Sequence, residues 1–340
     1  MSSTSRWLTI ALVACLVFGI VGGAMAQVKL NGAGATFPQP IYDKWFYDFS
    51  RATGLQVNYQ GIGSGGGIKA ITAGTVDFAG SDAPLSNADL AAMPSKLLQM
   101  PTVGGAVTLA TNLSGVGKQL RLSPATLSAI YLGTITRWND PKLVAENPGA
   151  RMPNQAITVV HRSDGSGTTF LFTSYLAAVS PTWKSQVGAG KDVKWPIGEG
   201  GKGNPGVAGL IKQIPGSIGY VELVYAAQNR LPVAALKNRA GKYVTPSLAS
   251  TSAAIAGAMR QLKVDVRSQT VNSAGVGAYP IVGLTFLLVY EHPKANAASL
   301  VKLLRYCMSA GAQKTASLYY YAPLPADLIA INNSLIGRIK

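Results

Sequence analysis

The sequence is poor in cysteine, histidine and acidic residues. Its 340 residues include 2 Cys, 2 His and 14 Asp and Glu, against 30 Lys and Arg. Two histidines, His161 and His292, with no cysteine cluster and no H-E-x-x-H motif, suggest no metal site. Cys15 lies in an apolar leader, so Cys307 is the thiol of the folded part; we expect no internal disulfide and a buried Cys307.

The charge is strongly basic, with a formal net charge of +16 at pH 7. Such a balance raises the possibility of a nucleic-acid or membrane partner. The cations are scattered, however, and the densest group is Lys237, Arg239 and Lys242. No basic stripe alternates with aromatic residues, which argues against a nucleic-acid partner. Attraction of small anions and adaptation to an acidic medium both remain open.

The first 26 residues have the pattern of an export signal. A polar start with one cation precedes the apolar run Leu8 to Val21, and Ala24-Met25-Ala26 matches an A-x-A cleavage site. We expect cleavage before Gln27 and an exported protein. An uncleaved membrane anchor and a lipoprotein signal at Cys15 are the alternatives; the second is disfavoured because apolar residues continue past that cysteine.

Short strand and helix patterns alternate along the rest of the chain, which predicts an α/β fold of about two domains. Apolar alternation or short apolar runs predict strands at 28–31, 55–59, 76–80, 107–110, 157–161, 217–221 and 279–290. Helical spacing predicts helices at 41–49, from 68, at 124–131, 169–179, 294–309 and 325–337.

Three glycine-rich loops each follow a strand, carry a hydroxyl and precede a helix. They are Ala35-Thr36-Phe37, Gly63-Ser64-Gly65 and Gly165-Ser166-Gly167-Thr168, with Arg162 just before the third. Each loop alone is best explained as a capped turn. Together they predict an anion site, because free amides at helix starts and nearby hydroxyls donate hydrogen bonds to negative oxygens.

Two other interpretations use the same loops. Residues 61–66 satisfy G-x-G-x-x-G, and Asp82 follows at the distance of a ribose contact in dinucleotide-binding folds. The export signal and the other anion loops argue against this interpretation. A hydrolase would need Ser64 or Ser166 as nucleophile with His161 or Asp164 nearby, but neither serine lies in G-x-S-x-G. We therefore expect no enzyme and a structural His161.

Five blocks of the sequence resemble the signature motifs of the periplasmic phosphate-binding proteins of the PstS family, which serve phosphate ABC importers. The resemblance extends over nearly all of residues 28–340. The blocks are Gly32-Ala33-Gly34-Ala35-Thr36-Phe37-Pro38, Gly61-Ile62-Gly63-Ser64, Ser81-Asp82-Ala83-Pro84, Asp164-Gly165-Ser166-Gly167-Thr168 and Lys194-Trp195-Pro196-Ile197-Gly198.

The resemblance implies a type II periplasmic-binding-protein fold, in which two α/β lobes with mixed sheets close on one dehydrated phosphate. We expect one lobe at 27–109 and 280–340 and the other at 110–279. The implied phosphate contacts are Thr36, Phe37 (backbone), Ser64, Asp82, Arg162, Ser166, Gly167 (backbone) and Thr168, with Asp164 supporting Arg162. The implied partners are inorganic phosphate, the permease subunits and their cytoplasmic ATPase; a monomer without cofactor or metal is expected.

Within this set Asp82 is the acceptor, whereas the hydroxyls, the amides and Arg162 donate. Phosphate near neutral pH keeps at least one proton and can donate it to a carboxylate. Sulfate has no proton to donate and would meet repulsion. The sequence therefore predicts that Asp82 sets the preference for phosphate over sulfate.

Overall fold

The computed structural model describes residues 29–294 and 296–340, so the predicted leader at 1–26 lies outside the described residues. The strands are β1 (Lys29–Gly34), β2 (Gln56–Gly61), β3 (Phe78–Ser81), β4 (Leu97–Thr111), β5 (Arg121–Leu122), β6 (Thr158–Arg162), β7 (Glu199–Gly201), β8 (Ser217–Glu222), β9 (Ala235–Lys237), β10 (Tyr243–Val244) and β11 (Val282–Tyr290). The helices are α1 (Gln39–Thr53), α2 (Ser64–Thr72), α3 (Asn87–Ala91), α4 (Pro124–Tyr131), α5 (Pro141–Glu146), α6 (Gly167–Val179), α7 (Pro181–Gln186), α8 (Gly203–Gln213), α9 (Leu223–Gln228), α10 (Leu248–Leu262), α11 (Ala297–Cys307), α12 (Ala310–Leu318) and α13 (Ala326–Ile336).

One mixed sheet of eight strands runs through the molecule in the order β2-β1-β3-β11-β4-β8-β6-β7. The outer pairs are parallel, whereas β11 is antiparallel to both β3 and β4, and β4 is antiparallel to β8. The long strand β4 pairs with β11 over residues 97–106 and with β8 over residues 107–111. It therefore connects the two halves of the sheet.

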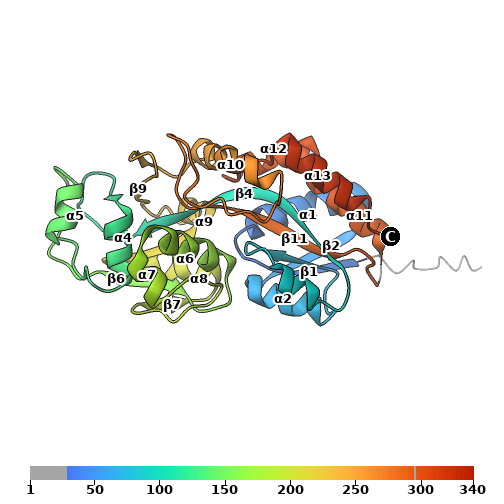
Figure 1. Ribbon diagram of the computed structural model, residues 1–340, viewed down its shortest axis with the longest axis horizontal. Helices are drawn as coiled ribbons and strands as arrows, with labels where there is room; N and C mark the ends of the chain where they lie inside the picture. The colour runs from blue at the N-terminus through green and yellow to red at the C-terminus, as the bar shows by residue number, and fades with distance from the viewer. Residues whose placement is uncertain (1–28, 295) are drawn as a thin grey trace, which may run out of the picture.

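The elements form two lobes along the long axis of the molecule (Figure 1). Strands β1 and β2 lie with α1, α2 and the C-terminal helices at one end, and β6 and β7 lie with α6, α7 and α8 at the other. Strand β4 passes between them, and α10 packs on β4 and β11. The α/β class and the two-lobed fold are as predicted, while the lobe bounds 27–109, 280–340 and 110–279 stay a prediction.

Helix α1 shows how an apolar pattern in the sequence determines which face of a helix is buried. Its buried residues recur at helical spacing: Ile41, Tyr42, Trp45, Phe46 and Phe49. Each fully buried side chain of this size contributes roughly 1.5–3 kcal/mol through the hydrophobic effect. The helix ends at a left-handed glycine cap. The predicted helix at 41–49 is confirmed and extends further at both ends.

Helix α4 begins where the sequence predicts. The Ser123 hydroxyl accepts a hydrogen bond from the Thr126 amide and Pro124 occupies the first helical turn. The cap works because its acceptor lies only three residues before the amide that it satisfies. Local patterns of this kind give reliable helix starts.

The C-terminal region differs from the prediction in one respect. The predicted helix at 294–309 is α11, which ends at Cys307, and α12 follows it directly. The Ser309 hydroxyl accepts from the Ala312 amide and starts this second helix, which periodicity alone did not separate from the first. Cys307 is fully buried as predicted, and burial raises the pKa of its thiol. In the described ranges, no helix combines the length and apolar character that crossing a bilayer requires.

Candidate functional site

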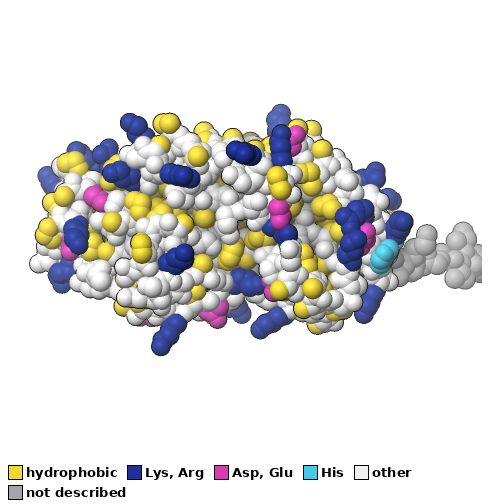
Figure 2. All heavy atoms as spheres, viewed as in Figure 1, with side chains coloured by type: hydrophobic (Ala, Val, Ile, Leu, Met, Phe, Trp, Pro, Cys, Tyr) yellow, Lys and Arg dark blue, Asp and Glu magenta, His cyan; other side chains and the backbone are white. Residues whose placement is uncertain are grey.

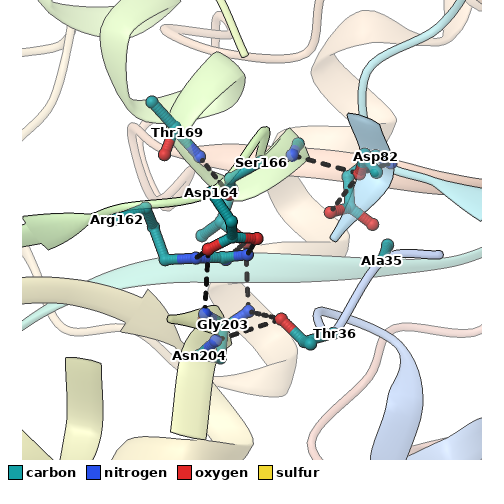
Figure 3. A network of polar contacts seen from close by, with 12 residues as sticks. Ala35, Thr36, Asp82, Arg162, Asp164, Ser166, Thr169, Gly203 and Asn204 are labelled. Atoms are coloured by element: carbon teal, nitrogen blue, oxygen red, sulfur yellow. Dashed lines mark hydrogen bonds and ion pairs between the residues drawn. The ribbon is translucent and has the colours of Figure 1, made fainter. Parts of the chain in front are cut away.

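The predicted anion loops meet between the two lobes (Figure 3). The loop after β1 and the end of β3 come from one lobe, and the end of β6, the start of α6 and the start of α8 come from the other. Ser166 begins α6 by accepting a hydrogen bond from the Thr169 amide at 3.0 Å. Because helix starts point inward here, the site is lined with amide and hydroxyl donors.

Arg162 and Asp164 form a two-pronged ion pair at the centre of this site. Arg162 Nε donates to Asp164 Oδ1 at 2.8 Å and Nη2 donates to Oδ2 at 2.5 Å. Oδ1 also accepts from the Gly203 amide at 2.9 Å. Burial acts to raise the pKa of Asp164, but the hydrogen bonds and charge of Arg162 outweigh it and hold that pKa below its ordinary value. The carboxylate thus fixes the guanidinium in one orientation.

Asp82 is a buried carboxyl at the end of β3, 1% exposed. The Thr285 hydroxyl donates to its Oδ1 at 2.7 Å, and the Ser64 hydroxyl lies 3.5 Å from its Oδ2. Burial raises the pKa of Asp82 to about 7, against the opposing effect of Thr285, Arg162 and Ser64. Burial therefore makes the charged form of this carboxyl costly unless a hydrogen-bond donor meets it.

Ser64 ties the two lobes together. Its Oγ accepts from the amide of Asp82 in its own lobe at 3.2 Å and from the amide of Gly167 in the other at 3.1 Å. One residue further on, the Gly65 amide donates to the Gly165 carbonyl at 2.8 Å. The glycines allow this close backbone approach, since a Cβ on Gly65 would lie 3.1 Å from the Cα of Gly165. The arrangement is that of two lobes in direct contact.

Thr36 and Phe37 complete the site from the loop before α1. Thr36 Oγ1 accepts from both the backbone and the side-chain nitrogen of Asn204, each at 3.0 Å. The carbonyls of Thr36 and Phe37 accept from buried tyrosine hydroxyls, those of Tyr225 and Tyr321. Of the residues that the structure describes, none supplies an acceptor for the amides of Phe37, Ser64 and Thr168.

The sequence carries the same family signal along almost its whole length. Residues 21–310 match a PBP superfamily domain. The chain is 45% identical over 307 residues to the phosphate-binding protein PstS of Xylella fastidiosa, covering 89% of this chain and 83% of the relative. It is 44% identical over 319 residues to the PstS protein of Haemophilus influenzae, covering 93% and 94%. The chain belongs to the PstS family of phosphate-binding proteins.

Solved structures agree with that assignment. A high-affinity periplasmic phosphate-binding protein solved with phosphate at pH 8.5 is 25% identical, covers 90% of this chain and 93% of its own, and has a TM-score of 0.72. A phosphate-binding protein of Stenotrophomonas maltophilia, at 20% identity and a TM-score of 0.66 with 90% and 93% coverage, shares the fold.

All of the residues that the PstS resemblance implied come together in the structure. They are Thr36, Phe37, Ser64, Asp82, Arg162, Asp164, Ser166, Gly167 and Thr168, and their side chains or amides lie around the pair formed by Arg162 and Asp164. Thr168 Oγ1 accepts from Arg162 Nη1 at 3.3 Å. Their roles toward a ligand stay predictions.

Sequence reasoning missed three buried polar residues of this PstS site: Asn204, Glu222 and Thr285. Asn204 lies between two glycines and next to a proline, a run that reads as a turn. Glu222 and Thr285 lie in apolar strands, where one polar residue gives little functional signal. The weak signal available was that Thr and Glu stand at positions where their strands otherwise carry apolar or small residues.

His161 lies beside this site without touching its serines. Its Nδ1 is 3.0 Å from the Arg162 carbonyl, and its ring stacks on Trp195 with centroids 4.7 Å apart. The imidazole is thus engaged in packing, in agreement with the structural role predicted. In the described part of the chain there is no group of three or more His, Cys, Asp or Glu suited to a metal ion.

The surface of the protein is basic without a concentrated patch on the visible face. Figure 2 shows Lys and Arg side chains dispersed over that face with few Asp and Glu among them. Scattered cations of this kind favour the approach of small anions.

Proposed function

We propose that this protein captures inorganic phosphate outside the cytoplasmic membrane and delivers it to an ABC importer. The observation that carries the proposal is the buried carboxyl of Asp82 among donors that otherwise suit an oxyanion. Thr285 and Ser64 place its oxygens at the end of β3, and burial raises its pKa to about 7. In its ionised form this carboxyl accepts a hydrogen bond from the protonated oxygen of a phosphate that the surrounding donors hold.

The remaining groups suit the other oxygens of phosphate. Arg162 keeps guanidinium protons that Asp164 does not engage, and a guanidinium can bind two oxygens of an oxyanion at once. The amides of Phe37, Ser64 and Thr168 and the nearby hydroxyls add donors at helix starts. Sulfate would offer the same acceptors but no proton for Asp82, so the carboxylate would repel it.

Closure of the two lobes explains how such a site excludes water and later releases its ligand. The contacts of Ser64 with Gly167 and of Gly65 with Gly165 suit a closed state. In this proposal the lobes span 27–109 with 280–340, and 110–279. The closed monomer docks on the permease subunits in the periplasm, where opening transfers phosphate and the cytoplasmic ATPase drives transport.

The proposal includes no catalytic step. The Ser64 hydroxyl accepts from the Gly167 amide and reaches the Asp82 carboxyl only at 3.5 Å, and the Ser166 hydroxyl caps α6, so neither serine contacts a histidine among the described residues. His161 is engaged with Trp195 and the Arg162 carbonyl. Purified protein is therefore expected to release no p-nitrophenol from p-nitrophenyl phosphate. Steady release that Ser166→Ala abolishes would contradict this part of the proposal.

Isothermal titration calorimetry with phosphate, sulfate and arsenate tests the binding function. We expect one phosphate per chain with tight binding, arsenate as a close competitor of the same geometry, and no heat with sulfate. A protein that shows no phosphate binding, or that binds sulfate equally well, would overturn the proposal.

A further inference from the structure

Asn204 is a buried amide that joins the two lobes at the start of α8. Its side chain is fully buried. Its Nδ2 donates to Thr36 Oγ1 at 3.0 Å and to Thr168 Oγ1 at 3.1 Å, and its backbone amide also donates to Thr36 Oγ1 at 3.0 Å. Figure 3 shows Asn204 directed toward Thr36, below the pair of Arg162 and Asp164. One side chain therefore contacts hydroxyls from both lobes.

The orientation of this amide is determined by its third contact. Asn204 Oδ1 accepts from the backbone amide of Glu222 at 2.9 Å. A backbone N–H can only donate, so the atom that faces it must be the carbonyl oxygen, and the nitrogen must face the two threonines. The two hydrogens of the nitrogen are then used in full, one for each hydroxyl.

These contacts leave each threonine hydroxyl with one role. A hydroxyl has two acceptor positions and one proton. Thr36 Oγ1 accepts twice from Asn204, and Thr168 Oγ1 accepts from Asn204 and from Arg162 Nη1, a group that has no acceptor capacity. Both protons must therefore point away from these donors. Neither hydroxyl donates to another described residue, although both side chains are at most 3% exposed.

We propose that Asn204 is a positioning residue that forces the hydroxyls of Thr36 and Thr168 to donate into the ligand site. This inference rests on the proposed phosphate binding and deepens it. On the side of Asn204 the site then only donates hydrogen bonds to the ligand, whereas on the side of Asp82 it accepts one. Since Thr36 reaches Asn204 across the lobes, its hydroxyl is set to donate only when the lobes meet.

Asn204→Asp tests the idea with an isosteric change. The introduced carboxyl can accept from both threonines, so their protons turn away from phosphate. Affinity should fall at least tenfold, but charge repulsion alone would also lower it. The deciding measurement is the loss of phosphate affinity that Thr36→Val causes in each background. In the native background this loss should be at least tenfold. In the Asn204→Asp background it should be less than threefold, because the Thr36 hydroxyl no longer donates to the ligand there. Thr36→Ser, which keeps the hydroxyl, should restore most of the affinity in the native background.

A matched control uses Asn332, another fully buried asparagine, whose Nδ2 donates to the Pro101 carbonyl away from the site. In an Asn332→Asp background, Thr36→Val should lower phosphate affinity as much as it does in the native protein. Where Asn204→Asp fails to fold, Asn204→Ala is used instead; the Thr36 hydroxyl is then free to rotate, so Thr36→Val should lower phosphate affinity by less than in the native background but not necessarily by less than threefold. Thermal unfolding of each variant without phosphate shows whether positions 36 and 204 are coupled only through the stability of the protein, as a purely structural role would require.

The outcomes separate the two proposals. The role of Asn204 would be overturned if Thr36→Val lowered phosphate affinity by the same factor in all backgrounds. It would also be overturned if changes at positions 36 and 204 were coupled in thermal stability but not in phosphate affinity. The protein would still bind phosphate in that case. Absence of phosphate binding by the native protein would instead overturn the proposed function.

Discussion

Asp164 holds Arg162 by two hydrogen bonds, Nε to Oδ1 at 2.8 Å and Nη2 to Oδ2 at 2.5 Å. The side chain of Arg162 is buried, with only 1% of it exposed to solvent. Because the carboxylate engages one edge of the guanidinium, Nη1 and the remaining Nη2 proton are directed away from it, and Nη1 lies near Thr168. The geometry explains how a buried cation is kept both paired and available.

The first prediction removes this cation. Arg162→Ala should weaken phosphate binding by about 3–5 kcal/mol, since a buried anion would lose its charged partner. Calorimetry measures the change directly. Arg338→Ala is the matched control, because Arg338 is also paired with a carboxylate, that of Glu291, but lies 39% exposed and away from the site. Phosphate affinity that stays within a factor of two in Arg162→Ala would remove Arg162 from the site.

The sequence allowed most of this site to be predicted because its loops are local patterns. A strand end, a glycine, a hydroxyl and a helix start lie within a few residues, and each such run leads into a helix at Thr36, Ser64 and Ser166. The helices themselves begin earlier than predicted, since α2 starts at Ser64 rather than at 68 and α6 starts at Gly167 rather than at 169. The resemblance to the PstS family then supplied their common ligand. Local chemistry and family pattern agreed on the same residues.

Contacts between distant segments were beyond the reach of sequence reasoning. Asn204 and Thr36 are 168 residues apart, and Thr285 and Asp82 are 203 residues apart. Nothing in a single sequence pairs the Gly-Asn-Pro-Gly run at the start of α8 with one particular threonine. Such partners become visible only when the fold places β11 beside β3 and the start of α8 against the loop after β1.

The second prediction concerns selectivity. Asp82→Asn keeps the size of the side chain but replaces a charge that repels sulfate with a neutral amide that can donate to it. Sulfate binding should become measurable, and the ratio of phosphate to sulfate affinity should fall at least tenfold, more than phosphate affinity itself falls. Competition calorimetry with both anions measures the ratio. Sulfate rejection as strong as in the native protein would show that another group discriminates between the anions.

The third prediction concerns pH and the stability of the phosphate-free protein. Burial raises the pKa of Asp82 to about 7 and holds the pKa of Glu222 well above its ordinary value. Between about pH 4 and pH 7 the folded protein keeps protons that the unfolded chain has released. Stability should therefore fall as pH rises through this interval, by on the order of 4 kcal/mol from Asp82.

Urea unfolding at a series of pH values tests the third prediction. Asp82→Asn and Glu222→Gln should each make the pH dependence shallower, because each removes one proton-binding group with a raised pKa. A native protein whose stability rises with pH over this interval would contradict the assigned direction. The same slope in both variants as in the native protein would show that neither carboxyl is responsible.

The last prediction concerns the contact between lobes at Gly63. This glycine has a positive φ of 82°, and a Cβ added to it would lie 2.3 Å from Asp164 Oδ2. Gly63→Ala should therefore push the loop before α2 away from Asp164 and weaken phosphate binding at least tenfold by opposing closure. Gly54→Ala provides a control for backbone strain alone, since Gly54 has a φ of 74° and its Cβ would meet no atom within 4 Å. Gly54→Ala should lose about 1 kcal/mol of stability and keep its phosphate affinity, whereas Gly63→Ala should lose at least as much stability and also lose affinity. Equal phosphate affinities in the two variants would show that the lobes can close without this contact.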